Sequence, residues 1–156
     1  EIIDRVMVVS EGHKGVVVLA LPINIDCNKL NTLVTALKKS GYKIIIKSEL
    51  QIKLLQYTFN AKLQAEFRIN ENMKVNIPIE NFCNLSNKIT FSFLITDKAN
   101  FDSTINFIKM IRPHTKCKFS LCANSLTSFQ YNDLCKLALT CPNVVQLNIT
   151  LDKYCY

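Results

Sequence analysis

The chain has 156 residues, of which 49% are hydrophobic, and it carries a formal net charge of +7. These values are typical of a single globular domain with a sizeable core. The longest apolar stretch, residues 15–25, is interrupted by Pro22 and Asn24 and is too short to cross a bilayer as a helix. We therefore expect one domain over residues 1–156 without a transmembrane segment, and the chain can be a piece of a longer protein.

Short apolar runs alternate along the chain with stretches of helical periodicity. The second apolar residue of each run marks six predicted strands, at Leu21, Ile46, Ile69, Phe93, Leu121 and Ile149. Apolar residues recur at helical spacing over residues 30–37, 50–57, 105–111 and 134–141. Phe91-Ser92-Phe93 returns 28 residues later as Phe119-Ser120-Leu121. A fixed period between about 20 and 50 residues predicts stacked repeats that share one core.

Two architectures can bury such repeats, a solenoid of strand-plus-helix units and a doubly wound parallel sheet. A solenoid leaves one face of its strands polar, and polar residues do alternate with apolar ones in the later strands. The runs Val16–Leu21 and Ile44–Ile46 are apolar on both faces, which is typical of a doubly wound sheet. We predict a right-handed α/β solenoid of about six parallel strands and keep the doubly wound α/β sheet as the alternative.

The spacing of apolar residues and asparagine over residues 115–155 carries a family resemblance. Phe119, Leu121, Asn124 and Leu126 fit the motif L-x-x-L-x-L-x-x-N/C-x-L, and the next copy is fitted by Val144, Leu147, Ile149, Asp152 and Tyr154. This segment resembles leucine-rich repeats of the ribonuclease-inhibitor-like or cysteine-containing subtype. Upstream, Asn24 fits the asparagine position, whereas Glu49 and Gln51 replace the motif residues of the second repeat. An asparagine at this position can bond backbone groups left free where the chain leaves the strand.

The resemblance implies a protein-binding module whose partner lies on the concave sheet face, and roles such as an adaptor or a bacterial effector. The predicted contact residues are Arg68, Thr90, Ser92, Leu94, Lys118, Ser120, Gln146 and Asn148. Leu94 is the candidate apolar anchor because it interrupts a polar row. We expect Leu121→Asp to unfold the domain and Ser120→Asp to be tolerated, since the Ser120 side chain should face solvent.

Seven cysteines, an odd number without C-x-x-C spacing, indicate neither a disulfide framework nor a zinc site. They predict free thiols in the cytoplasm, either of the producing cell or of a host cell if the protein is an effector. No glycine-rich phosphate loop occurs, so we expect no cofactor, no metal and no enzymatic activity. The alternatives are a small doubly wound α/β enzyme, or a thiol enzyme that pairs His114 with Cys117 or Cys122.

Charged residues add two expectations. The densest basic group is Lys38, Lys39, Lys43 and Lys47, which we interpret as a solvated patch near a helix end that can attract an acidic protein or an anionic lipid. Nucleic-acid binding is therefore not favoured, although an RNA- or DNA-binding accessory domain is a third possibility. Asp26, Glu49 and Asp102 fall at predicted strand-to-helix junctions, where we expect them to cap helices.

Overall fold

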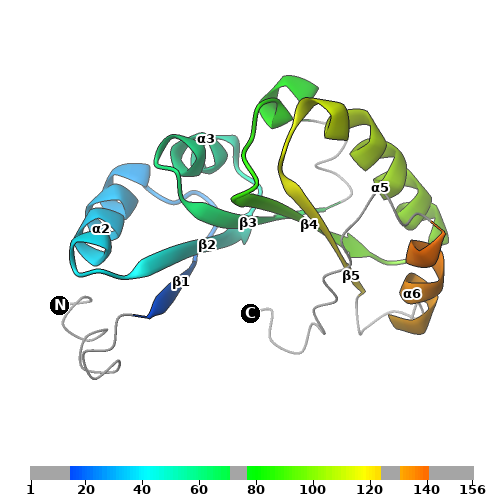
Figure 1. Cartoon of the computed structure of the whole chain (residues 1–156), viewed down its shortest axis with the longest axis horizontal. Coiled ribbons are helices and arrows are strands. Elements are labelled where there is room, and N and C mark those ends of the chain that lie inside the picture. The colour runs from blue at the N-terminus through cyan, green and yellow to red at the C-terminus, as the bar shows by residue number, and fades with distance from the viewer. Residues whose placement is uncertain (1–14, 71–76, 124–130, 141–156) are drawn as a thin grey trace. The chain divides into compact units, whose positions relative to one another are not determined.

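The computed structural model describes residues 15–70, 77–123 and 131–140. These residues form five parallel strands and four α-helices, so the predicted α/β class is confirmed (Figure 1). The strands adjoin one another in chain order and are β1 (Val16–Ala20), β2 (Lys43–Glu49), β3 (Gln64–Ile69), β4 (Ile89–Ile95) and β5 (Lys118–Ala123). The helices are α2 (Cys27–Lys39), α3 (Ile52–Asn60), α5 (Lys98–Ile111) and α6 (Tyr131–Leu139), with short 3₁₀ helices η1 (Ile79–Phe82) and η2 (Arg112–His114).

The chain divides into two compact units, unit 1 (residues 1–66) and unit 2 (residues 67–156), and the division falls inside β3. Four predicted strand positions, from Ile46 to Leu121, lie inside β2, β3, β4 and β5. The predicted marker Leu21 lies one residue beyond the end of β1. The β1 residue that pairs with the next marker, Ile46, is Leu19. The sixth predicted strand, at Ile149, lies outside the described residues.

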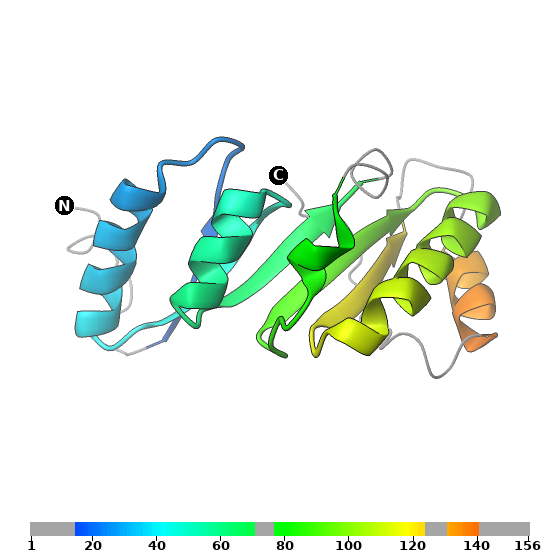
Figure 2. The same cartoon turned by 90° about the horizontal axis from the view of Figure 1, so that it is seen from above.

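In unit 1, α2 and α3 lie side by side on one face of the strands (Figure 2). The buried residues there are Leu30, Val34 and Leu37 of α2, Leu54 and Leu55 of α3, and Ile44 and Ile46 of β2. The other face of β1 is exposed, since Val16 and Val18 keep 54% and 51% of their surface accessible. The apolar run at β1 therefore does not indicate that both faces of this strand are covered.

Helices α2 and α3 end in the same backbone motif. The residue after each C-cap has a positive φ, 88° at Gly41 and 53° at Lys62. The next N–H group then donates back to a helical carbonyl, from Tyr42 to Leu37 at 3.1 Å and from Leu63 to Thr58 at 2.9 Å. This is the Schellman arrangement, which satisfies carbonyl groups that a helix end leaves without partners. It turns each helix directly into the following strand, β2 or β3.

A glutamine joins the loops that follow β1 and β2. The Gln51 side-chain amide donates to the Pro22 carbonyl at 3.2 Å, and its oxygen accepts from the Asn24 N–H at 3.0 Å. Asn24 itself is an exposed turn residue with φ of 66°. The side-chain amide that bonds the backbone after β1 is thus that of Gln51 and not that of Asn24. Gln51 belongs to the next repeat and stands where the leucine-rich-repeat motif has leucine.

Unit 2 has a core of phenylalanine rings between its strands and α5. Phe82 lies edge-on to Phe91 and to Phe107, with ring centroids 5.1 and 5.5 Å apart, and Phe93 also contacts Phe107. Edge-to-face packing is favoured because the positive ring edge meets the negative ring face. The strands β4 and β5 pair in parallel with Phe91 opposite Phe119 and Phe93 opposite Leu121. The 28-residue period predicted for these residues is therefore confirmed as the register of the sheet.

Of the three predicted helix caps, one is confirmed and two are wrong. Asp26 caps α2 as expected, and its carboxylate accepts from the Asn28 N–H at 2.9 Å. The cap of α5 is Asp97, which accepts from the Asn100 N–H at 2.8 Å, whereas Asp102 lies inside this helix. Glu49 is the last residue of β2 and does not cap α3, whose N-cap Gln51 makes no side-chain capping bond.

Candidate partner-binding face

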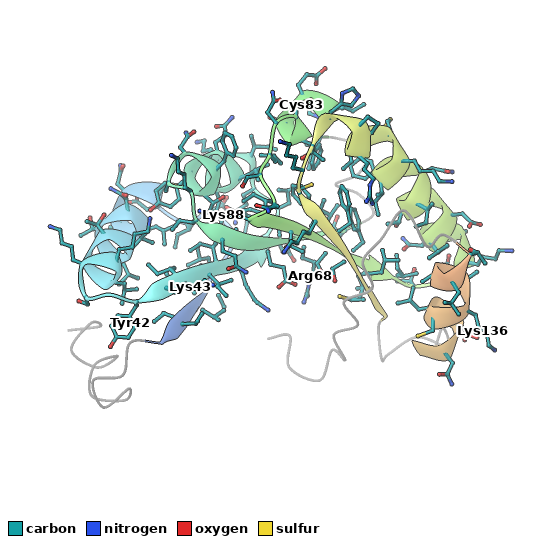
Figure 3. All side chains as sticks on the ribbon, in the orientation of Figure 1. Tyr42, Lys43, Arg68, Cys83, Lys88 and Lys136 are labelled. Carbon is teal, nitrogen blue, oxygen red and sulfur yellow. The ribbon has the colours of Figure 1, made fainter. Side chains whose placement is uncertain are left out.

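Side chains alternate across a strand, so the residues between the core phenylalanines of unit 2 point to the opposite face. The register places Thr90 beside Lys118, Ser92 beside Ser120, and Leu94 beside Cys122. Arg68 lies between the buried Phe67 and Ile69 of β3, and Figure 3 shows its side chain on the side away from the helices. We call this surface the polar face of unit 2; it consists of Arg68, Thr90, Ser92, Leu94, Lys118, Ser120 and Cys122.

Burial corrects the prediction at two of these positions. Ser92 and Ser120 are only 5% and 3% exposed, so the expectation that Ser120 faces solvent is wrong, and Ser92 is equally inaccessible. The Ser92 hydroxyl lies 3.2 Å from the Cys122 sulfur and hydrogen-bonds with it. Both serines therefore contribute to internal packing more than to an accessible surface.

The accessible part of the polar face consists of five residues. Lys118 is exposed, and Arg68, Thr90, Leu94 and Cys122 are half-buried. The two charged residues among them are cations, and the acid on the same side of β3, Glu66, forms an ion pair with Lys47. A half-buried leucine between cationic and hydroxyl-bearing neighbours offers an apolar contact with a polar surround, which is the composition of many protein-binding surfaces. The predicted residues Gln146 and Asn148 lie outside the described residues.

The two proposed thiol–imidazole pairs do not have a catalytic arrangement. Cys117 is buried, and this burial raises the pKa of its thiol to about 11, so the thiol is protonated at neutral pH. His114 is exposed in η2, before β5 begins, whereas Cys122 is the fifth residue of β5. The four steps along the strand from Lys118 to Cys122 alone span about 13 Å. His114 is therefore out of hydrogen-bond reach of Cys122.

Unit 1 adds residues that the sequence interpretation did not select. On the same side of the strands as the exposed Val16 and Val18, Ile45 of β2 is half-buried beside Val18. Lys47 of β2 forms an ion pair of 3.0 Å with Glu66 of β3. An apolar run cannot by itself distinguish this exposed strip from a strand that is covered on both sides.

The described cysteines, Cys27, Cys83, Cys117, Cys122 and Cys135, are free thiols. No three His, Cys, Asp or Glu side chains in the described ranges are grouped closely enough to hold a metal ion. Among these same residues, no helix combines the length and the apolar character that crossing a membrane requires.

Comparison with known proteins gave no relative. None of the protein-family models, curated proteins or solved structures that were compared with the chain matches it.

Proposed function

We propose that the chain is a leucine-rich-repeat-like α/β solenoid that binds a protein partner on the polar face of unit 2. Its role would be that of an adaptor or an effector acting in the cytoplasm of the producing cell or of a host. The mechanism is surface complementarity: Leu94 inserts as an apolar anchor, and Arg68 and Lys118 meet acidic or hydrogen-bonding groups of the partner.

The strand order supports the solenoid. A doubly wound sheet reverses the direction in which strands are added, and its ligand crevice lies at that reversal. The five described strands instead follow one another in chain order. Within each unit, the helices that pack on the strands do so from one side (Figures 1 and 2). Both features are those expected when each repeat stacks on the previous one.

The register of β4 and β5 is the single observation that carries the binding proposal. It brings two equivalent rows together, with Thr90 beside Lys118 and Leu94 beside Cys122. Because these four side chains are not fully buried and come from adjacent strands, they can contact one partner surface together.

The test is affinity capture with matched apolar-to-polar variants. Leu94→Ser removes the proposed anchor, and Met110→Ser removes a 48% exposed apolar side chain of α5 instead. We expect a partner captured by the unaltered chain to be lost, by about tenfold or more, from Leu94→Ser. The same partner should be retained by Met110→Ser.

Thermal melts of both variants must accompany the capture, since Leu94 is half-buried. An exposed charge reversal, Lys118→Glu, provides a second probe of the same face that should leave folding intact. The proposal fails if the partner binds Leu94→Ser and Lys118→Glu as well as the unaltered chain. It also fails if Met110→Ser loses the partner to the same extent.

A further inference from the structure

Basic side chains gather in unit 2 at the N-terminal ends of β4 and β5. We call this group the basic rim; it consists of Lys88, Lys109, Arg112, Lys116 and Lys118, and all five residues are exposed. Lys109 lies in the last turn of α5 and Arg112 begins η2. Lys116 precedes β5, and Lys118 is its first residue. Lys88 directly precedes β4 and is labelled in Figure 3.

Backbone hydrogen bonds hold the rim segments against each other. The Lys116 N–H donates to the Leu85 carbonyl at 3.0 Å, and the Asn84 N–H donates to the His114 carbonyl at 2.9 Å. The β4–β5 pairing begins with Thr90 beside Lys118, and Lys88 lies just before it, in a turn closed by the bond from the Ile89 N–H to the Ser86 carbonyl at 3.1 Å. Lys88 and Lys116 thus belong to two neighbouring segments whose backbones are fixed by hydrogen bonds. Figure 2 shows the two loops side by side at one end of the strands.

The helix dipole accounts for only part of this group. A cation is favoured in the last turn of a helix, which covers Lys109 and Arg112 at the end of α5. Lys88, Lys116 and Lys118 belong to loops and to a strand, where no helix end requires them. The acids of α5 are elsewhere, because Asp97 and Asp102 lie at its N-terminal side, at the opposite end of the strands. Glu80 in η1 is the acid that precedes the Lys88 loop.

We propose that the basic rim, which shares Lys118 with the polar face but does not include Leu94, binds an acidic segment of a protein. Four of the five charges are lysines, which attract carboxylates and phosphates alike as point charges, and Arg112 alone can make paired hydrogen bonds with either group. The large exposed apolar side chains described in unit 2, Met110 and Leu139, include no aromatic ring on which a base could stack. This chemistry favours a polypeptide rich in Glu and Asp over a single-stranded nucleic acid.

The experiment uses the full chain and a fluorescently labelled peptide rich in Glu, measured by anisotropy at low salt and at about 0.3 M salt. The rim variant is Lys88→Gln with Lys116→Gln. The matched control is Lys98→Gln with Lys136→Gln, which removes one exposed lysine from α5 and one from α6 in the same unit. Lys136 is labelled in Figure 3. We expect the rim variant to bind the peptide about tenfold more weakly, and the control to remain within about twofold of the unaltered chain.

A charge-preserving variant, Lys88→Arg with Lys116→Arg, should retain binding and so separates loss of charge from loss of folding. An RNA oligonucleotide and vesicles of anionic lipid serve as competing probes. The inference is overturned if the peptide does not bind at low salt, if the control loses as much affinity as the rim variant, or if RNA or vesicles bind more tightly than the peptide. Because Leu94 is unaltered throughout, failure here is distinguishable from failure of the polar-face proposal.

Discussion

Ser120 and Leu121 are neighbours in β5 that point to opposite faces, and both are buried, at 3% and 0% exposure. Leu121 lies opposite Phe93 in the core, and Ser120 lies opposite Ser92 on the polar face. The sequence pattern correctly assigns the two side chains to different faces. It does not reveal that the second face is inaccessible at this point, because that depends on the side chains of adjacent strands.

We predict that Leu121→Asp and Ser120→Asp each lower the free energy of unfolding by about 3 kcal/mol or more, because each introduces a charge into a dry position. Lys118→Asp, on the same face as Ser120 but exposed, should change it by less than about 1 kcal/mol. Urea denaturation followed by circular dichroism measures all three. A Ser120→Asp variant as stable as Lys118→Asp would show that the polar face is open at its centre.

Helix caps show a similar limit at the scale of single residues. Asp26 and Asp102 both precede apolar residues at helical spacing, yet only Asp26 is a cap. Helix α5 begins earlier than its isoleucines indicate, since its first turns bury Phe101 and Thr104 as well. The N-cap is the last residue before helical backbone angles begin, and Asp97, whose backbone is extended, occupies that position.

At the scale of elements, α2 and α3 end in the same backbone motif but carry different residues at its positive-φ position, Gly41 after α2 and Lys62 after α3. Gly41 adopts its positive φ without steric cost, whereas a lysine at this position brings its Cβ close to backbone atoms. Lys62 is therefore held in an unfavourable conformation by the carbonyl bonds that end α3 and by the burial of Leu63.

We predict that Gly41→Ala lowers the free energy of unfolding by about 1 kcal/mol and that Lys62→Gly raises it by about 0.5 to 1 kcal/mol. Because Lys62 takes part in a further interaction, part of the effect of Lys62→Gly can come from losing the lysine side chain. Lys62→Ala, which also removes that side chain but keeps a Cβ, is therefore the reference for Lys62→Gly. Thermal melts should rank Lys62→Gly above Lys62→Ala. The reverse order would mean that the positive φ at Lys62 is not present in solution.

Side-chain bonds also connect one repeat to the next within unit 1. Gln51 reaches the loop after β1, and the Lys38 ammonium donates to the Ala61 carbonyl at the end of α3, at 3.2 Å. The Tyr57 hydroxyl of α3 donates to the Asn31 side chain of α2 at 3.3 Å. These bonds join residues 23 to 29 positions apart, so no local pattern reveals them.

At the scale of the whole molecule, the solenoid proposal predicts an extended particle in solution. A compact globule of this length has a radius of gyration of about 15 Å. We expect small-angle scattering of the monomer to give a value clearly above this one, because stacked repeats add length along one direction. A value at or below it would contradict the solenoid and favour the doubly wound sheet.

The sequence by itself determined the alternation of strand and helix, the apolar side of each element and the 28-residue offset between β4 and β5. These features follow from local periodicity, which covalent geometry converts directly into faces of a helix or strand. Tertiary structure alone decided that Ser92 and Ser120 are buried, that Gln51 rather than Asn24 bonds the loop after β1, and that the segments before β4 and β5 are joined by hydrogen bonds. The physical reason is that exposure, hydrogen-bond partners and charge proximity belong to pairs of residues far apart in the chain, which only the pairing of strands brings together.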